Sequence, residues 1–268
     1  MLGLIPIHDD NPTRRPAVVT WTLIAINVVV FFLSPISPLD VGGDANTPAG
    51  FCRQLAFFRE WAAIPVELLE NDPLDVTAGP PSGNRCVPVR PEYQKVPALS
   101  VLSAMFLHGG LLHLAGNMLF LFVFGNNVED RLGHVPFLLF YLVGGIAAAL
   151  IQVMIAPQSD IPLVGASGAI AAVLGAYIVL FPGARILSLV FLGFFYQLLE
   201  VPALIVLGFW FALQLLNGVV TLGPETAEGG VAFFAHIGGF VFGLAVGLLL
   251  RVVGAGTGRE RRGIGSMG

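Results

Sequence analysis

Residues 161–184 read IPLVGASGAIAAVLGAYIVLFPGA, a run of 24 residues without a charged side chain. A helix needs about 20 apolar residues to cross the hydrocarbon core of a bilayer. Backbone amides cannot stay unpaired in lipid, so a run of this length predicts a membrane-spanning helix. Five further charge-free runs have similar or greater length: 16–39, 96–128, 132–159, 201–224 and 229–250. We therefore predict an all-α membrane protein with a bundle of six transmembrane helices.

The composition of the whole chain agrees with this prediction. Of its 268 residues, 56% are hydrophobic and only 11% are charged, where soluble domains carry about 25% charged residues. A nucleic-acid-binding surface needs an excess of basic residues, but here 13 Lys and Arg face 17 Asp and Glu. Two cysteines are too few for a disulfide-based scaffold. An integral, multi-pass membrane protein without a nucleic-acid partner is what remains.

The arginines orient the predicted spans. With six spans and an inner amino terminus, the short outer loops around 157–163 and 218–230 carry no Lys or Arg. Basic residues concentrate in cytoplasmic segments of membrane proteins, so this arrangement places both termini in the cytoplasm. The arginines of the inner segments are Arg14, Arg15, Arg131, Arg185, Arg251, Arg259, Arg261 and Arg262.

These spans divide the chain into three parts. We expect a cytoplasmic tail at 1–15, a six-helix domain at 16–253 with a long first outer loop at 40–95, and a disordered cytoplasmic tail at 254–268. The charge-free segment 186–199 is only 14 residues long, which is short for a span. We expect it to form an interfacial or partly embedded connection.

The first outer loop holds both cysteines, Cys52 and Cys86. In an oxidising compartment, such as the outer side of a bacterial inner membrane, they would form a disulfide. Two unrelated free thiols are the alternative, and the sequence does not decide between them.

Four polar residues stand out within the predicted spans: His113, Asn117, Ser167 and His236. Polar residues within a membrane usually face the bundle interior and mark function. Counted along their helices at 1.5 Å per residue, His113, Ser167 and His236 each lie roughly 6–10 Å below the outer surface. His113 is expected about six residues into its helix, and Asn117, four positions later, shares its face. We therefore expect the four residues to form one site.

Small residues give a reason for two of these helices to meet. Stripes of small residues allow helix backbones to approach closely in lipid. If the two stripes pack together, Ser167 and His236 lie at the same seam, and a serine beside an imidazole base meets the requirement for nucleophilic catalysis. The His113 ring, the Asn117 amide and backbone N–H groups of the 165–168 turn could then stabilise an oxyanion. The stripes are Ser167, Ala171 and Gly175 on one helix and Gly239, Gly243 and Gly247 on the other.

Other interpretations apply to these residues one at a time. A lone serine in a membrane helix usually packs or bonds to its own helix backbone, and a lone histidine or asparagine often joins two helices. His108 and His113 are five positions apart and do not share a helix face, so we do not expect a zinc site made from them with His236. The HExxH pattern of metalloproteases does not occur. We predict neither a metal nor a cofactor.

Three motifs resemble those of the rhomboid intramembrane serine proteases. His113 and Asn117 lie in HGGLLHLAGNMLFLFVFG at 108–125, Ser167 lies in GASG at 165–168, and His236 lies in AHIGG at 235–239. The segment VEDRLG at 128–133 resembles the loop after the family's second helix. Their order and spacing extend the resemblance over about 16–250.

The resemblance implies roles for these residues. Ser167 would attack a peptide carbonyl, and His236 would act as its base in a dyad without a carboxylate. His113, Asn117 and the backbone N–H groups of Gly165, Ala166 and Ser167 would form the oxyanion hole.

The resemblance also extends to the surroundings of the site. Residues 218–234 resemble the family's mobile cap over the active site, and the helix around Trp210 resembles its lateral gate. Some members stack an aromatic ring on the base from one turn after the nucleophile, where this chain has Ala171. The imidazole is then expected to be held more loosely, or by another ring such as Phe233 or Phe234.

These observations predict an intramembrane serine endopeptidase. By resemblance, its partners would be membrane lipid and single-pass transmembrane proteins, cut at small residues within or next to their spans. We expect a bacterial inner-membrane location and predict no oligomeric state. The alternatives are a non-catalytic member that binds membrane helices, which would typically lack the serine or the histidine, and a transporter or channel, for which charged spans or inverted repeats are expected.

Overall fold

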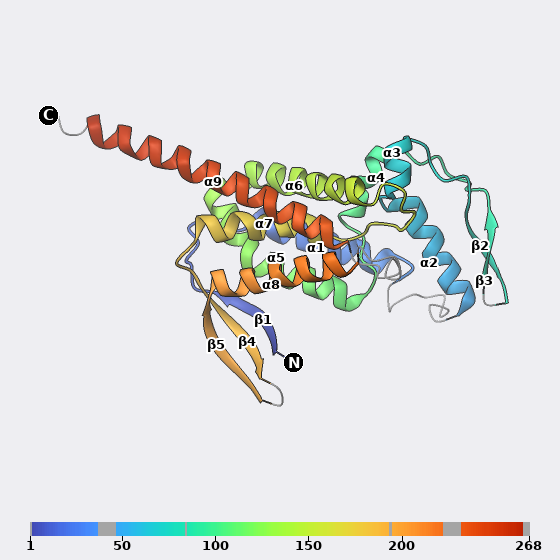
Figure 1. The fold of residues 1–268 in the computed structure, drawn as a ribbon, viewed down its shortest axis with the longest axis horizontal. Coiled ribbons are helices and arrows are strands. Elements are labelled where there is room, and N and C mark those ends of the chain that lie inside the picture. Colours follow the sequence, from blue (N-terminus) through green and yellow to red (C-terminus); the bar gives the residue numbers. More distant parts are fainter. Residues whose placement is uncertain (1, 37–46, 84, 193–194, 222–231, 265–268) are drawn as a thin grey trace.

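The protein is a mostly helical bundle, seen here in a computed structural model that describes residues 2–36, 47–83, 85–192, 195–221 and 232–264 (Figure 1). Six apolar helices each begin in a different one of the six charge-free runs. They are α1 (Val18–Leu33), α5 (Leu111–Leu132), α6 (His134–Ile155), α7 (Ser167–Leu180), α8 (Ala203–Val220) and α9 (Phe233–Ile264).

Four of these helices, α5, α6, α8 and α9, are long and apolar enough to cross a membrane. The apolar helices α1 and α7 are shorter, with 16 and 14 residues. The described part of the chain is therefore that of an integral membrane protein with four clear spanning candidates, and the predicted count of six spans is not confirmed by helix length.

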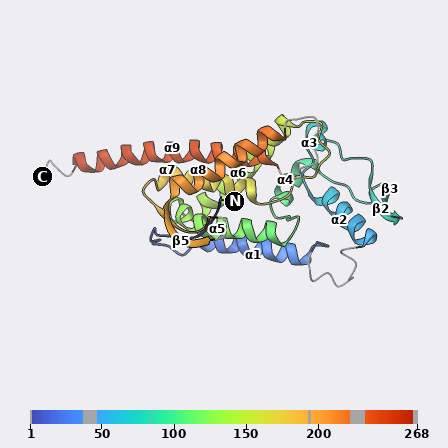
Figure 2. The ribbon, with the colours of Figure 1, turned by 60° about the horizontal axis from the view of Figure 1, so that its bottom comes forward.

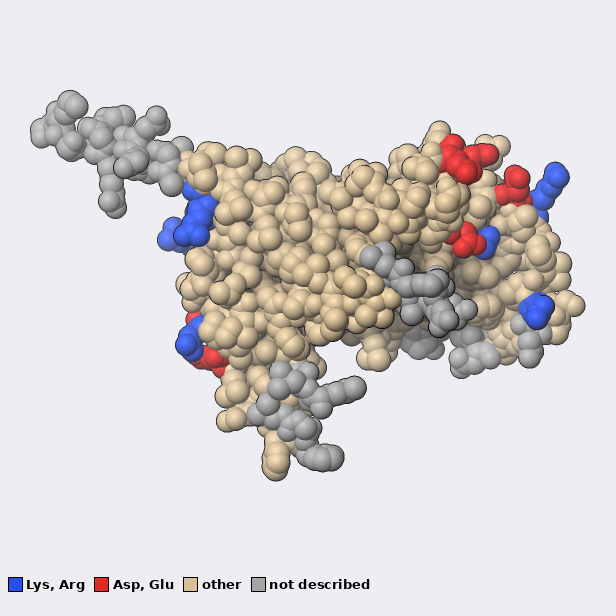
Figure 3. All heavy atoms as spheres, in the orientation of Figure 1, with Lys and Arg blue, Asp and Glu red and all other residues tan. Residues whose placement is uncertain are grey.

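The remaining elements gather at the two ends of the bundle (Figures 1 and 2). The loop end carries α2 (Pro48–Trp61), α3 (Pro65–Glu70), β2 (Thr77–Ser82), β3 (Arg85–Val89) and α4 (Pro97–Ala104). The sheet end carries β1 (Leu2–Asp9), β4 (Arg185–Leu192) and β5 (Phe195–Pro202). Charged side chains on the face shown in Figure 3 lie at these two ends, and the surface between them is uncharged. This distribution matches a protein whose middle is surrounded by lipid.

The three-stranded sheet corrects the all-α prediction. Its order is β1-β4-β5, and both pairs are antiparallel. Most of the segment 186–199, predicted as an interfacial connection, lies in the strands of the hairpin β4–β5, and the segment 1–15, predicted as a tail, contains β1. Isoleucine, valine and phenylalanine in β4 suit a strand. Its backbone partners in β1 lie more than 170 positions earlier, such as Leu4 opposite Val190. Local periodicity cannot reveal a pairing at this separation.

A buried carboxylate joins the sheet end to the helices. Oδ2 of Asp9 accepts a hydrogen bond from the Tyr177 hydroxyl at 2.8 Å and another from the Asn127 amide. Burial raises the pKa of Asp9 above its ordinary value, and the hydrogen bonds oppose that shift. These contacts attach β1 to α5 and α7.

The VEDRLG segment contributes a second buried carboxylate, Glu129 near the end of α5. Its two oxygens accept from the backbone N–H groups of Val19 and Thr20 at 2.9 and 2.7 Å. The first N–H groups of a helix lack partners within the helix and attract negative charge. Glu129 therefore caps α1 and fixes it beside α5.

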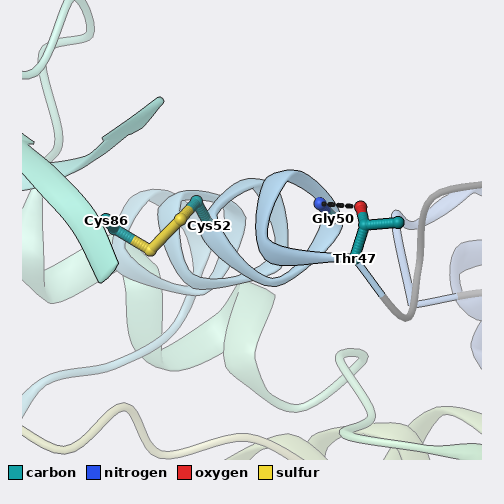
Figure 4. The surroundings of a disulfide bond; sticks show 4 residues. All are labelled: Thr47, Gly50, Cys52 and Cys86. Carbon is teal, nitrogen blue, oxygen red and sulfur yellow. Dashed lines mark hydrogen bonds between the residues drawn. A yellow bond between two sulfur atoms is a disulfide. The ribbon is translucent and has the colours of Figure 1, made fainter. Parts of the chain in front are cut away.

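Two links hold the loop end together. Cys52 of α2 and Cys86 of β3 form a disulfide, which decides between the two alternatives that the sequence left open (Figure 4). The ammonium of Lys95 lies 2.6 Å from the Glu67 carboxylate, and both side chains are only 3% exposed. Burial lowers the pKa of Lys95, and the Glu67 carboxylate opposes that shift. The segment predicted as the first outer loop is thus an ordered structure over its described residues.

Helix α7 forms the centre of the bundle, with 11 of its 14 residues buried. Its small-residue stripe packs against that of α9, which is the condition under which the sequence places Ser167 and His236 together. A Cβ on Gly239 would collide with the carbonyl oxygen of Gly168, and one on Gly243 would collide with that of Ala172. This backbone contact brings the beginning of α7 against the beginning of α9.

Helix α9 extends further than the sequence predicts. It runs to Ile264, past the predicted domain boundary at 253, so residues 254–264 of the expected disordered tail are helical.

Candidate active site

The polar residues singled out in the sequence lie near the beginnings of three helices, all at the loop end. Ser167 is the first residue of α7, His236 the fourth of α9 and His113 the third of α5. His113 lies nearer the start of its helix than the six residues expected, because the first part of the run 96–128 forms the separate helix α4. The common placement follows from α5, α7 and α9 running in the same direction.

Ser167 and His236 are in direct contact. The Ser167 Oγ lies 2.7 Å from Nε2 of the imidazole. On its other side, Nδ1 of His236 lies 2.7 Å from Oε1 of Gln214 in α8. Since an amide oxygen only accepts, Nδ1 carries the proton and Nε2 is left to accept the hydroxyl proton of Ser167.

Aromatic rings from two helices lie around the imidazole. The ring of Trp210 is 5.9 Å from that of His236, and Phe233 presents its ring edge-to-face at 6.5 Å. Of the two rings expected from the sequence, Phe233 makes a described ring contact with His236. Ala171 is fully buried against the α9 backbone, which leaves no space for a ring at that position.

His113 and Asn117, both in α5, line the same cavity as Ser167. The Gly109 N–H donates to Nδ1 of His113 at 3.4 Å, which leaves Nε2 as the protonated nitrogen. Nδ2 of Asn117 lies 2.9 Å from Nε2 of His108, a buried residue. One N–H of the Asn117 amide is thereby occupied and the second is available to the cavity.

The turn before Ser167 has a backbone that favours glycine. Gly165 has φ of +122°, and a Cβ there would lie 2.9 Å from Nε2 of His113. Its N–H donates to the carbonyl oxygen of Ala104 at 2.9 Å. Gly165 therefore does not fit the role of oxyanion donor expected from the sequence, because its amide is already bonded. Its contribution is to let His113 approach the serine.

The backbone N–H groups of Ala166 and Ser167, unlike that of Gly165, lie at the start of helix α7. Ala166 is the N-cap of α7, and Ser167 begins the helix. Amides at the first turn of a helix have no partner within the helix and suit an anionic ligand.

A cavity of about 560 Å³ opens beside Ser167 and His236. Its volume is in the usual range of about 300–1,000 Å³ for ligand sites. Its lining combines the four polar residues with apolar side chains, among them Gly109, Leu112, Phe120, Val164, Ile170, Leu174, Trp210 and Ala232. The predicted cap, 218–234, is described only at its two edges, and 222–231 lie outside the described residues.

Gln214 and the contact of His108 with Asn117 were not predicted from the sequence. Gln214 is a polar side chain in the charge-free run 201–224, so the cost of burying it in lipid could have marked it. Within the described part of the chain, no group of three His, Cys, Asp or Glu residues is placed to hold a metal ion.

The sequence also matches a known protein family. The model of the Rhomboid domain matches residues 97–252, which is more than half of the chain and includes all four polar residues. The chain belongs to the rhomboid family.

Curated rhomboid relatives match the same region. RHOMBOID-like protein 4 of Arabidopsis thaliana is 33% identical over 57% of this chain and 34% of its own length. Rhomboid protein 1, mitochondrial, of Saccharomyces cerevisiae is 31% identical over 56% of this chain and 41% of its own. RHOMBOID-like protein 2 of Arabidopsis thaliana is 30% identical over 88% of this chain and 66% of its own. The chain thus spans between about a third and two thirds of these relatives.

Membership in the rhomboid family supports a function in intramembrane proteolysis at the level of the family. The relatives named here are plant and mitochondrial proteins, so they give no support to the bacterial inner membrane expected from the sequence. That location stays a prediction.

Proposed function

We propose that this chain is an active intramembrane serine endopeptidase that uses Ser167 as nucleophile and His236 as general base. The observation that carries the proposal is the 2.7 Å contact between Ser167 Oγ and the unprotonated Nε2 of His236, at the wall of a cavity. The imidazole would take the serine proton as Oγ attacks a peptide carbonyl, and would then pass that proton to the leaving amine.

The oxyanion formed in this attack would be stabilised by donors around Ser167. His113 offers Nε2–H, Asn117 offers its second amide N–H, and the first turn of α7 offers the amides of Ala166 and Ser167. Donors that are already oriented toward developing charge are effective because they need little reorganisation.

The short length of α7 supports a site inside the membrane. Fourteen residues at 1.5 Å each span about 21 Å, less than the roughly 30 Å of the hydrocarbon core. In our proposal α1 and α7 also cross the membrane, in addition to the four longer helices, and α7 begins below the membrane surface with Ser167 at its start. The domain 16–253 and two cytoplasmic termini belong to the same proposal.

A second, smaller pocket supports a preference for small residues at the cleavage site. It has a volume of about 40 Å³, and Ser167 belongs to its lining as well. Its lining includes Gly145, Ala148, Gly168 and Ala235. Such a space accepts a side chain of about the size of a methyl group. The proposed substrates are therefore transmembrane proteins with a small residue within or beside the span.

The test compares Ser167→Ala and His236→Ala with the wild-type chain in purified proteoliposomes. We expect both variants to fold and neither to cleave a model transmembrane substrate, and we expect a fluorophosphonate probe to label only the wild type. Ser100→Ala is the control, because the Ser100 side chain is buried outside the lining of the cavity and its hydroxyl donates to the carbonyl oxygen of Pro97. Equal cleavage by the wild type and the Ser167→Ala variant would overturn the proposal, and an unlabelled, inactive wild type would favour a non-catalytic member.

A further inference from the structure

We infer that Gln214 is a positioning residue that holds the His236 imidazole in the tautomer required for Ser167 to react. This inference rests on the proposed function. It adds to the dyad a third residue, from α8, a helix that carries neither member of the dyad.

Two hydrogen bonds fix the orientation of the Gln214 amide. Its Nε2 donates to the carbonyl oxygen of Trp210, one turn earlier in α8, at 3.4 Å. Because that carbonyl can only accept, the nitrogen of the amide faces Trp210 and the oxygen faces His236. The oxygen then accepts from Nδ1–H at 2.7 Å. The reverse orientation would place a donor against Nδ1 and an oxygen against an oxygen.

The orientation of the amide determines the chemistry of the ring. With Nδ1 protonated, the lone pair of the neutral imidazole is on Nε2, which faces Ser167 Oγ. The other tautomer would place an N–H against the serine hydroxyl and could not accept its proton. A nucleophile, a base and a group that orients the base form the arrangement that activates serine.

The hydrogen bond between Gln214 and His236 involves the buried side chain of Gln214, so water cannot easily replace it. Gln214 is only 9% exposed, and Trp210 packs beside the imidazole on the same face of α8. Water has little access to replace the amide oxygen, so loss of Oε1 would leave Nδ1–H without its acceptor. When the ring takes the serine proton it becomes an imidazolium, and the same oxygen then binds a more acidic N–H.

The experiment replaces Gln214 in the full chain, in proteoliposomes, by Met and by Glu. Met is close to Gln in length and has no acceptor for Nδ1–H, whereas Glu keeps an acceptor and loses the donor to Trp210. Gln152→Met is the matched control, because Gln152 accepts from the Ala235 N–H beside His236 but does not bond to the imidazole. The readouts are the fluorophosphonate labelling rate and the separate kcat and KM values.

We expect Gln214→Met to lower the labelling rate and kcat by about 100-fold, within the range of about 10²–10⁴ that general-base catalysis supplies. KM should stay nearly constant. Gln214→Glu should keep both rates within about tenfold of wild type, and Gln152→Met within about threefold. Equal rates for Gln214→Met and an active wild type would overturn the inference and leave the proposed function intact. An equal loss for Gln214→Glu and Gln214→Met would also overturn it.

A spectroscopic measurement covers the case in which Gln214→Met folds poorly. Nitrogen NMR on ¹⁵N-histidine protein, assigned with His236→Ala, reports which imidazole nitrogen carries the proton. We expect Nδ1 to be protonated in the wild type and in Gln214→Glu. An Nε2-protonated His236 in the wild-type protein would overturn the inference.

Discussion

Helix α9 meets its neighbours α7 and α8 in two different ways. Against α7 the contact is between backbones, since Gly239 and Gly243 lie directly over the carbonyl oxygens of Gly168 and Ala172. Against α8 the contact is between side chains. Phe211 stacks on Phe240 with ring centroids 4.4 Å apart.

This difference separates two requirements of the proposed dyad. In the contact between the backbones of α7 and α9, the two helices cannot move closer or slide past each other. This contact fixes the distance between the backbone at Ser167 and the backbone at His236. Side-chain contact with α8 can adapt, and it determines how the imidazole is turned through Gln214 and Trp210. We therefore expect substitutions on the α7 side to affect folding and those on the α8 side to affect reactivity.

The largest loss of stability is expected for Ala171→Tyr. Ala171 is fully buried, and its Cβ lies opposite Gly239. A ring at this position would separate α7 from α9, and overpacking on this scale should cost about 3 kcal/mol or more of the free energy of unfolding. Unfolding in a detergent titration would measure the loss.

The aromatic ring that some family members carry at this position should therefore not restore a stack on His236 in this chain. An Ala171→Tyr protein as stable and as reactive as wild type would show that the seam is not closed by backbone contact.

A smaller loss of stability is expected for Gly243→Ala. The added methyl group would meet the Ala172 carbonyl, and backbone atoms can move only if the two helices separate. Insertion of one methyl into a packed contact typically costs about 1–3 kcal/mol. The same detergent titration would detect it.

Gly218→Ala provides the matched control in α8. A Cβ at Gly218 would meet only side-chain atoms, the nearest at 3.3 Å on Ile237. The Cδ1 of Ile237 can rotate away, and the other near neighbours lie at 3.5 Å, an ordinary van der Waals distance. Alanine also favours a helix over glycine by about 1 kcal/mol. We expect a change within about 1 kcal/mol of wild type. Equal losses at positions 218 and 243 would contradict the distinction between the two interfaces.

The same distinction explains how much the sequence could predict. The contact between α7 and α9 could be predicted from the sequence, because small residues recur every four positions and place Ser167 and His236 on that contact. The contact of Gln214 with His236 could not be predicted, because a single polar residue in an apolar helix does not indicate its partner. The sheet was missed for a related reason: β1 and β4 pair across more than 170 residues, and neither strand has a local pattern that names the other. Glycine at 165 was recognised, but the bond from its N–H to Ala104 depends on the position of α4.

The smallest effect is expected for Phe211→Leu, which separates packing by α8 from the hydrogen bond of Gln214. Leucine keeps most of the buried apolar volume and removes the stack on Phe240, and aromatic pairs contribute about 0.5–1.5 kcal/mol beyond their area. We expect a loss of about 1 kcal/mol in the detergent titration, with labelling of the folded protein by fluorophosphonate within about twofold of wild type. The acceptor for Nδ1–H is intact in this variant, so the orientation of the ring should be preserved. If Phe211→Leu instead slowed labelling as much as Gln214→Met does, α8 would act on His236 through packing in general, and the assignment of orientation to one amide oxygen would fail.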